Sequence, residues 1–155
     1  CKRSPGVPAT WPAVGCALAD LAPRFGFAVT GCAPADQAGA FPDSVRVVEG
    51  FALDTAPGRR RYVVVSTQGR GDEPALRAAL AAGAGYVSFV GSHAKARALR
   101  EELTAEGVEA EAFNTLRAPA GLDIGAITPE EIALSILAEM VEHRRRGQRG
   151  APEAV

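Results

Sequence analysis

The 155-residue chain has little of what would mark it as a specialised kind of protein. It has three cysteines and no CxxC pair, which argues against a zinc site or a disulfide framework and favours free thiols. No apolar run approaches the roughly 18 residues that a membrane helix needs. The formal net charge is only −1, so the charge balance gives no attraction to nucleic acid or to a membrane surface.

The remaining composition, 47% hydrophobic and 23% charged, is that of an ordinary globular protein. No secretory signal is visible, so we expect a cytoplasmic location. The length suits one domain with a full core. We expect residues 1–146 to form this domain and residues 147–155 to be a flexible tail, because that tail offers no core residue.

Short β-rich segments alternate with helical patterns along the chain. Residues 1–9 fit a loop or a damaged first strand, and residues 31–43 fit a loop. Strands are expected at residues 27–30, 45–48, 61–67, 86–90 and, at an edge, 108–113, and helices at residues 11–25, 72–82, 92–106 and 129–145. This alternation predicts an α/β fold of three layers, with an open, mostly parallel sheet and helices on both faces.

Ligands of such sheets bind outside the carboxyl ends of the strands, which directs attention to the turns that follow them. One of these turns holds Gly91, Ser92, His93 and Lys95. Gly91 lets a ligand approach closely, Ser92 can cap the next helix, and Lys95 adds a positive charge. The pattern fits a phosphate or carboxylate cradle, and equally an ordinary strand-to-helix turn with a solvated His93.

A second turn follows the clearest strand and holds Thr67, Gly69 and Asp72. Its hydroxyl, glycine backbone and carboxyl group suit hydrogen bonding to a polar heterocycle. The alternative is a flexible turn in which Asp72 caps the following helix.

A third loop, residues 117–127, leads into a strongly capped helix. Thr128 and Glu131 form a capping box. In the loop itself, Gly121 fixes the backbone and Asp123 is the one acid. Asp123 can anchor a ligand by hydrogen bonding, or it can brace its own loop.

Signatures of catalysis and of dinucleotide binding are missing. The first strand-to-helix turn has Trp11 and Pro12 where a GxGxxG motif would stand, and Ala33 occupies the place of a ribose-binding acid. No Ser-His-Asp set and no metal-ligand cluster stands out, so we expect neither catalytic residues nor a metal. The arginines of residues 144–146 fit a solvated helix end that complements the helix dipole.

Three segments, in consistent order and spacing over residues 62–142, resemble the C-terminal Rossmann domain of the XdhC/CoxI family. They are Tyr62-Val-Val-Val-Ser-Thr-Gln-Gly-Arg-Gly-Asp, Tyr86-Val-Ser-Phe-Val-Gly-Ser-His-Ala-Lys and Ala118-Pro-Ala-Gly-Leu-Asp-Ile-Gly-Ala-Ile-Thr-Pro-Glu-Glu-Ile-Ala. The last of these is the most specific.

The resemblance implies a maturation factor for molybdenum hydroxylases such as xanthine dehydrogenase or carbon monoxide dehydrogenase. Such a factor binds the molybdenum cofactor (molybdopterin), protects it during sulfuration and passes it to the apoenzyme, so it is a carrier more than an enzyme. By this resemblance the following residues would hold the pterin or its phosphate: Thr67, Gly69, Asp72, Gly91, Ser92, Lys95, Gly121 and Asp123.

The expected partners are the hydroxylase apoenzyme, further copies of this chain and a separate chain that supplies the family's N-terminal domain, which has no counterpart in this sequence. Two other hypotheses stay open. The chain is either an NAD(P)-binding oxidoreductase or regulatory domain with a degenerate dinucleotide site, or an interaction module whose pocket is no longer used.

Overall fold

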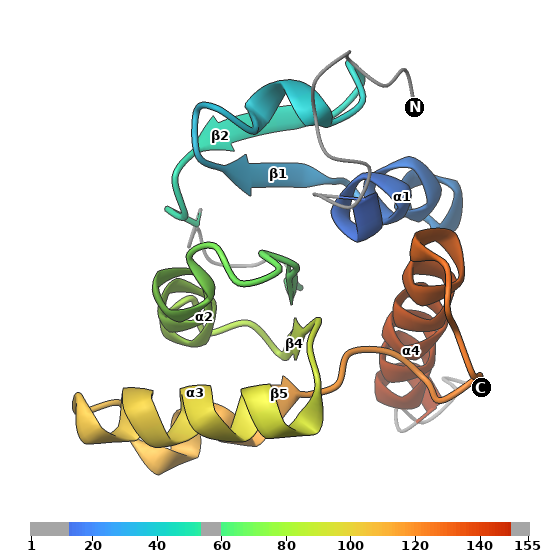
Figure 1. Ribbon diagram of the computed structural model, residues 1–155. Helices are drawn as coiled ribbons and strands as arrows, with labels where there is room; N and C mark the ends of the chain where they lie inside the picture. The colour runs from blue at the N-terminus through green and yellow to red at the C-terminus, as the bar shows by residue number, and fades with distance from the viewer. Residues whose placement is uncertain (1–12, 54–59, 150–155) are drawn as a thin grey trace.

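The computed structural model describes residues 13–53 and 60–149, in which helices alternate with parallel strands in open sheets (Figure 1). This confirms the predicted α/β class. The elements in chain order are α1 (Ala13–Leu21), η1 (Ala22–Phe25), β1 (Thr30–Ala33), η2 (Ala38–Ala40), β2 (Arg46–Glu49), β3 (Tyr62–Val65), α2 (Asp72–Ala81), β4 (Tyr86–Phe89), α3 (His93–Ala105), η3 (Ala110–Thr115), β5 (Leu116–Arg117) and α4 (Pro129–Arg149), where η marks a 3₁₀ helix.

The described strands form two parallel sheets in place of the single sheet that the sequence predicted. β1 pairs with β2, and β4 lies between β3 and β5. Val63 lies opposite Val87, and Val87 lies opposite Leu116. Because the strands run parallel, β3 and β4 end at the same edge, and the turns that follow them are neighbours.

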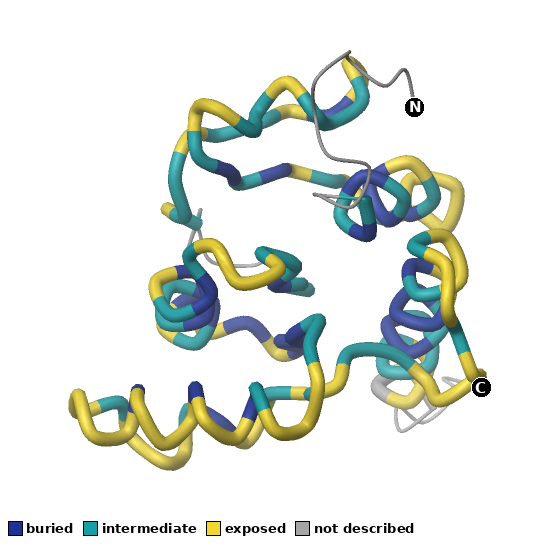
Figure 2. The backbone as a smooth tube through the Cα atoms, viewed as in Figure 1, coloured by how far each residue is buried: buried dark blue, intermediate teal, exposed yellow. Residues whose placement is uncertain are grey.

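Helices cover both faces of the three-stranded sheet, as predicted. One core, which includes Leu76, Phe89 and Leu103, packs α2 and α3 against one face. The other core joins Tyr86 to Ile136 and packs α1 and α4 against the opposite face. Side chains of a strand alternate between the two faces, so Tyr86 and Phe89 serve different cores. Figure 2 shows the buried sides of these helices turned toward the sheet.

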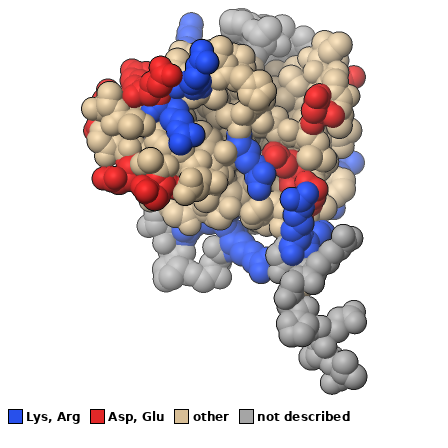
Figure 3. Space-filling view, turned by 90° about the horizontal axis from the view of Figure 1, so that it is seen from below, with Lys and Arg blue, Asp and Glu red and all other residues tan. Residues whose placement is uncertain are grey.

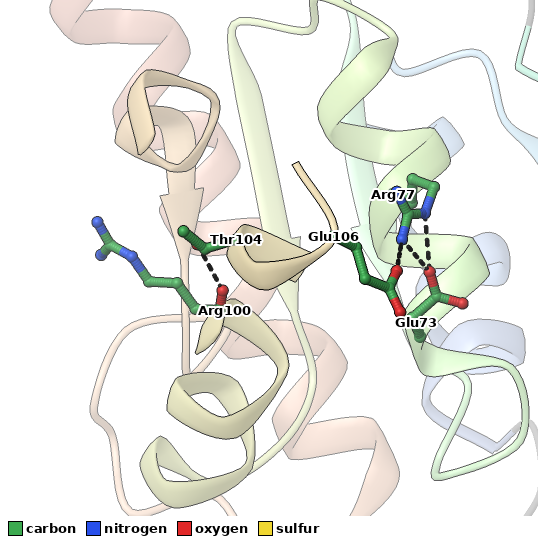
Figure 4. Close-up of polar contacts among 5 residues, drawn as sticks. All are labelled: Glu73, Arg77, Arg100, Thr104 and Glu106. Carbon is green, nitrogen blue, oxygen red and sulfur yellow. Dashed lines mark hydrogen bonds and ion pairs between the residues drawn. The ribbon is translucent and has the colours of Figure 1, made fainter. Parts of the chain in front are cut away.

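Helix α2 is also linked to the end of α3 by an ion-pair network on the surface. The Arg77 guanidinium lies 2.8 Å from a Glu73 carboxylate oxygen and also contacts Glu106 (Figure 4). Within α3, the Thr104 hydroxyl donates to the carbonyl of Arg100 over 2.7 Å. On the face drawn in Figure 3, acidic and basic side chains are interspersed, as the small net charge would suggest.

The strand predicted at residues 27–30 is displaced in the structure. β1 begins at Thr30 and includes Gly31, Cys32 and the buried Ala33, which the sequence placed in a loop. These small residues have weak strand preference of their own. Pairing with β2 therefore sets the limits of the strand, and a local pattern does not report that pairing.

The edge strand predicted at residues 108–113 is wrong. The segment runs into η3, and the strand that follows it, β5, has only two residues. The alternation of Glu and Ala in this segment imitates a strand, although both residues favour helical backbone. Phe113 is buried in the first core, with the Arg100 guanidinium 5.2 Å from its ring centre.

Helices α1 and α4 end at other residues than predicted. A 3₁₀ turn containing Pro23 follows α1, and Gly26 closes that turn with φ +80°. Helix α4 continues to Arg149, three residues into the predicted tail; the rest of that tail and the predicted loop at residues 1–9 lie outside the described residues. Within the described ranges, no helix is both long and apolar enough to cross a membrane.

Two aliphatic side chains of α4 give a test of this packing. Ile136 is fully buried, whereas Leu134 is 51% exposed on the same helix. Ile136→Ala leaves a cavity and should lower the free energy of unfolding by about 2–5 kcal/mol. Leu134→Ala should change it by about 0.5 kcal/mol or less. Urea denaturation of both variants measures the difference, and equal losses would contradict the assignment of α4 to the second core.

Candidate functional site

Four of the predicted site residues meet at the carboxyl edge of β3 and β4. The backbone N–H of Gly69 donates to Asp72 Oδ1 over 2.9 Å, and the Thr67 hydroxyl donates to the same oxygen. Lys95 Nζ lies 2.5 Å from Asp72 Oδ2. A single carboxylate therefore joins the turn after β3 to the first turn of α3.

The environment of Asp72 keeps its carboxylate ionised. Burial alone would raise its pKa, but hydrogen bonds from Lys95, Thr67 and Gly69 outweigh burial and hold the pKa below its usual value. The side chain does not cap α2, because the N-cap position belongs to Gly71 with φ +82° and no side-chain cap. The helix-cap alternative for Asp72 is therefore wrong.

The turn after β4 completes this edge. The Ser92 side chain accepts the backbone N–H of Lys95 over 3.2 Å, which confirms the predicted cap of α3. A Cβ atom on Gly91 would lie 2.4 Å from the Phe89 ring, so packing as well as ligand access explains this glycine. The positive ends of the α2 and α3 dipoles both lie at this edge, which favours an anion there.

A buried polar atom lies at the same edge. Ser66 directly follows β3, and its hydroxyl oxygen is buried without a hydrogen-bond partner among the residues that the structure describes. A buried hydroxyl of this kind is normally satisfied by a partner. The Asp72 carboxylate and the first N–H groups of α3 make the edge suitable for a ligand that carries both N–H groups and a phosphate.

Gly121 and Asp123 make local contacts of a different kind. The N–H of Gly121 donates to Glu139 Oε2 over 3.0 Å, and a Cβ atom there would lie 2.3 Å from Ser135 Oγ. This glycine lets its loop pack against α4. Asp123 is exposed and accepts the N–H of Gly125 at 3.4 Å, which is the loop-bracing contact proposed as its alternative.

The capping box that begins α4 is confirmed. Glu131 Oε2 accepts the N–H of Thr128 over 2.9 Å, and the N–H of Glu131 donates to Thr128 Oγ1 over 3.2 Å. Of the three arginines near the other end of α4, Arg145 and Arg146 are exposed as predicted, whereas Arg144 is less solvated. Arg144 donates to the Phe25 carbonyl over 2.9 Å, and its guanidinium lies 4.6 Å from the Phe27 ring centre.

Sequence reasoning missed a buried acid on the opposite face of the sheet. Glu139 is 9% exposed, accepts the Tyr86 hydroxyl over 2.7 Å, and has Arg117 Nη1 at 3.7 Å. Burial and the bond to Glu139 raise the pKa of Tyr86. The buried position of Glu139 could have been predicted from its spacing with Ser135 and His143. This spacing places a polar group every four residues beside the apolar stripe of α4.

Two cavities lie away from all eight predicted residues. One, of about 600 Å³, runs between Phe25 and the outer face of α4. The other, of about 350 Å³, lies beside Arg60, Tyr62 and His143 at the amino ends of β3 and β4. Trp11, which the sequence places at the first strand-to-helix turn, lies outside the described residues.

The sequence matches the model of the XdhC Rossmann domain family over residues 12–140. The chain belongs to this family. A Rossmann domain agrees with the open parallel sheets of the structure.

Two proteins similar to this chain are longer than it. An uncharacterized protein of Escherichia coli K12, YqeB, is 32% identical over 99 residues, which cover 64% of this chain and 18% of YqeB. A crystal structure titled as a xanthine dehydrogenase from Bacillus halodurans superposes with a TM-score of 0.68 at 28% identity. That match covers 92% of this chain and 43% of the other. The chain thus spans less than half the length of either protein.

Asp72 and its partners Thr67, Gly69 and Lys95 form a cluster, called here the Asp72 cluster. This cluster predicts a pH-dependent contribution to stability. The depressed pKa means that this contribution is present above the ordinary value of 3.8 and is lost as the pH falls through the folded-state pKa. Asp72→Asn should lower the free energy of unfolding by about 1–2 kcal/mol at pH 7. The difference in the free energy of unfolding between Asp72→Asn and the unsubstituted protein should be smaller at pH 3.

Urea denaturation at the two pH values makes this measurement, with the exposed Asp123 as the matched position. Asp123→Asn should have little effect at either pH, because its one hydrogen bond lies at the surface. A gap for Asp72→Asn that is the same at pH 7 and pH 3 would contradict the ionised state assigned to this carboxylate.

Proposed function

We propose that this chain is the cofactor-binding module of a maturation factor for a molybdenum hydroxylase of the xanthine dehydrogenase or carbon monoxide dehydrogenase type. In this role it acts in the cytoplasm as a carrier that binds the molybdenum cofactor, and it is not itself an enzyme. Membership of the XdhC Rossmann domain family and the similarity to a structure titled as a xanthine dehydrogenase support this role.

The observation that carries the proposal is the placement of Asp72 and Lys95 between two helix N-termini. Asp72 accepts three hydrogen bonds, and a carboxylate has about four acceptor positions, so one is left for an N–H of a pterin ring. Lys95 and the first N–H groups of α3 suit the cofactor's phosphate. The Thr67 hydroxyl, which donates to Asp72 Oδ1, would hold the carboxylate in place for this contact.

The loop before α4 supports a docking role for the same module. Leu122, Ile124 and Ile127 are 38%, 52% and 85% exposed. Neighbouring exposed apolar side chains are typical of protein interaction surfaces. We propose that this loop meets the hydroxylase apoenzyme, and that self-association and a separate N-terminal-type partner complete the assembly.

Isothermal titration with molybdopterin under anaerobic conditions tests the proposal. The intact chain should bind with measurable heat. Lys95→Met should weaken binding about tenfold, because it removes a charge-assisted hydrogen bond. Arg97→Met is the matched control, since Arg97 is a 78% exposed cation on the same helix, and it should leave the affinity unchanged.

Circular dichroism of each variant checks that it is folded. Titrations with NADH and NADPH test the alternative that the site binds a dinucleotide. The absence of binding heat at high micromolar molybdopterin would contradict the proposal. Binding of NADH or NADPH without binding of molybdopterin would support the dinucleotide hypothesis instead.

A further inference from the structure

The cavity of about 350 Å³ lies at the end of the sheet opposite the candidate cofactor site. Arg60 and Arg61 directly precede β3, and Gly85 directly precedes β4, so these residues mark the amino ends of both strands. His143 and Arg146 come from α4, which covers this end. The cavity is thus separate from the Asp72 cluster.

The wall of this cavity is positively charged. Among the described residues, its lining includes three arginines, Arg60, Arg61 and Arg146, and no aspartate or glutamate. Arg146 pairs with Glu142 over 2.6 Å, yet its side chain remains 74% exposed. Guanidinium groups match the geometry of phosphate oxygens and bind them through paired N–H bonds.

His143 forms part of the same wall beside two tyrosines. Its ring centre is 5.7 Å from that of Tyr62 and 5.5 Å from that of Tyr86. Its Nδ1 atom is buried and has no hydrogen-bond partner among the residues described. A buried imidazole nitrogen in this state is poorly suited to protonation, because the charged form would need an acceptor at both nitrogens.

Most of the surrounding charges lower the pKa of His143, as burial does. Burial, followed by Arg117 and Arg60, lowers its pKa; Arg146 adds to this, and Glu139 partly opposes it. An anion bound among the arginines would offset their field. The imidazole would then be protonated more readily, so its pKa would report on occupancy of the cavity.

Two glycines leave the cavity open. A Cβ atom on Gly83 or Gly85 would meet no heavy atom within 4 Å. Gly83 has φ +63°, so a side chain there would strain the backbone, whereas Gly85 is not among the positive-φ glycines. A side chain at Gly85 can therefore be used to fill the opening.

We propose that this cavity binds the phosphate groups of a small molecule. The volume lies at the lower end of the range for small-ligand sites. Arg60, Arg61 and Arg146 would bind the phosphate oxygens, and His143 would lie beside them. The site is independent of molybdenum-cofactor binding at the carboxyl edge.

Proton NMR of the two histidines in the full chain, titrated with inorganic pyrophosphate, tests the proposal. The pKa of His143 should rise as pyrophosphate binds. His93 lies at the start of α3, where the proposed cofactor site would also take up pyrophosphate, so its shift reports on that site and not on the cavity. Potassium chloride at matched ionic strength is the reference, and it should raise the pKa of His143 less than pyrophosphate does.

Two variants and a control complete the experiment. Gly85→Leu, which fills the opening, should abolish the response of His143, and Arg60→Gln should weaken pyrophosphate binding about tenfold. Arg97→Gln removes an exposed arginine on α3 and should bind as the unsubstituted chain does. An unchanged His143 pKa at millimolar pyrophosphate, an equal rise in potassium chloride, or full binding by folded Gly85→Leu would each overturn the proposal.

Discussion

The Asp72 carboxylate is the interaction on which the arrangement of the carboxyl edge depends. It accepts hydrogen bonds from the turn after β3 and pairs with Lys95 on α3. A buried carboxylate is costly unless it is paired and hydrogen-bonded, so the three groups that surround Asp72 must hold their positions together. The parallel pairing of β3 with β4 brings the two turns close enough for one side chain to join them.

The opposite face of the sheet uses a second carboxylate in a similar way. Glu139 accepts the Tyr86 hydroxyl from β4 and the N–H of Gly121 from the loop before α4. The two acids hold different segments: Asp72 fixes the turns at the proposed cofactor site, and Glu139 fixes the base of the loop that exposes Ile124 and Ile127. Asp72 and Glu139 thus tie both the proposed cofactor site and the proposed docking loop to β4 or its neighbouring turns.

Features that depend on local sequence could be predicted, and features that depend on distant contacts could not. The helices, the β3 and β4 strands and the Thr128–Glu131 capping box follow from short-range spacing, and the structure has them. The Glu139 bond to Tyr86 joins residues 53 positions apart. The arginine-lined cavity likewise joins segments near residues 60, 85 and 143. The strand predicted at residues 108–113 is wrong because the alternating Glu and Ala residues there adopt a 3₁₀ helix in which Phe113 is buried.

The central claim is that the carboxyl edge around Asp72 binds the molybdenum cofactor. Backbone amide chemical-shift mapping with molybdopterin tests it most directly, because it locates the ligand. The largest shifts should occur at the turn of residues 67–72 and at the first turn of α3. Shifts confined to the amino ends of β3 and β4, or no shifts at saturating ligand, would contradict it.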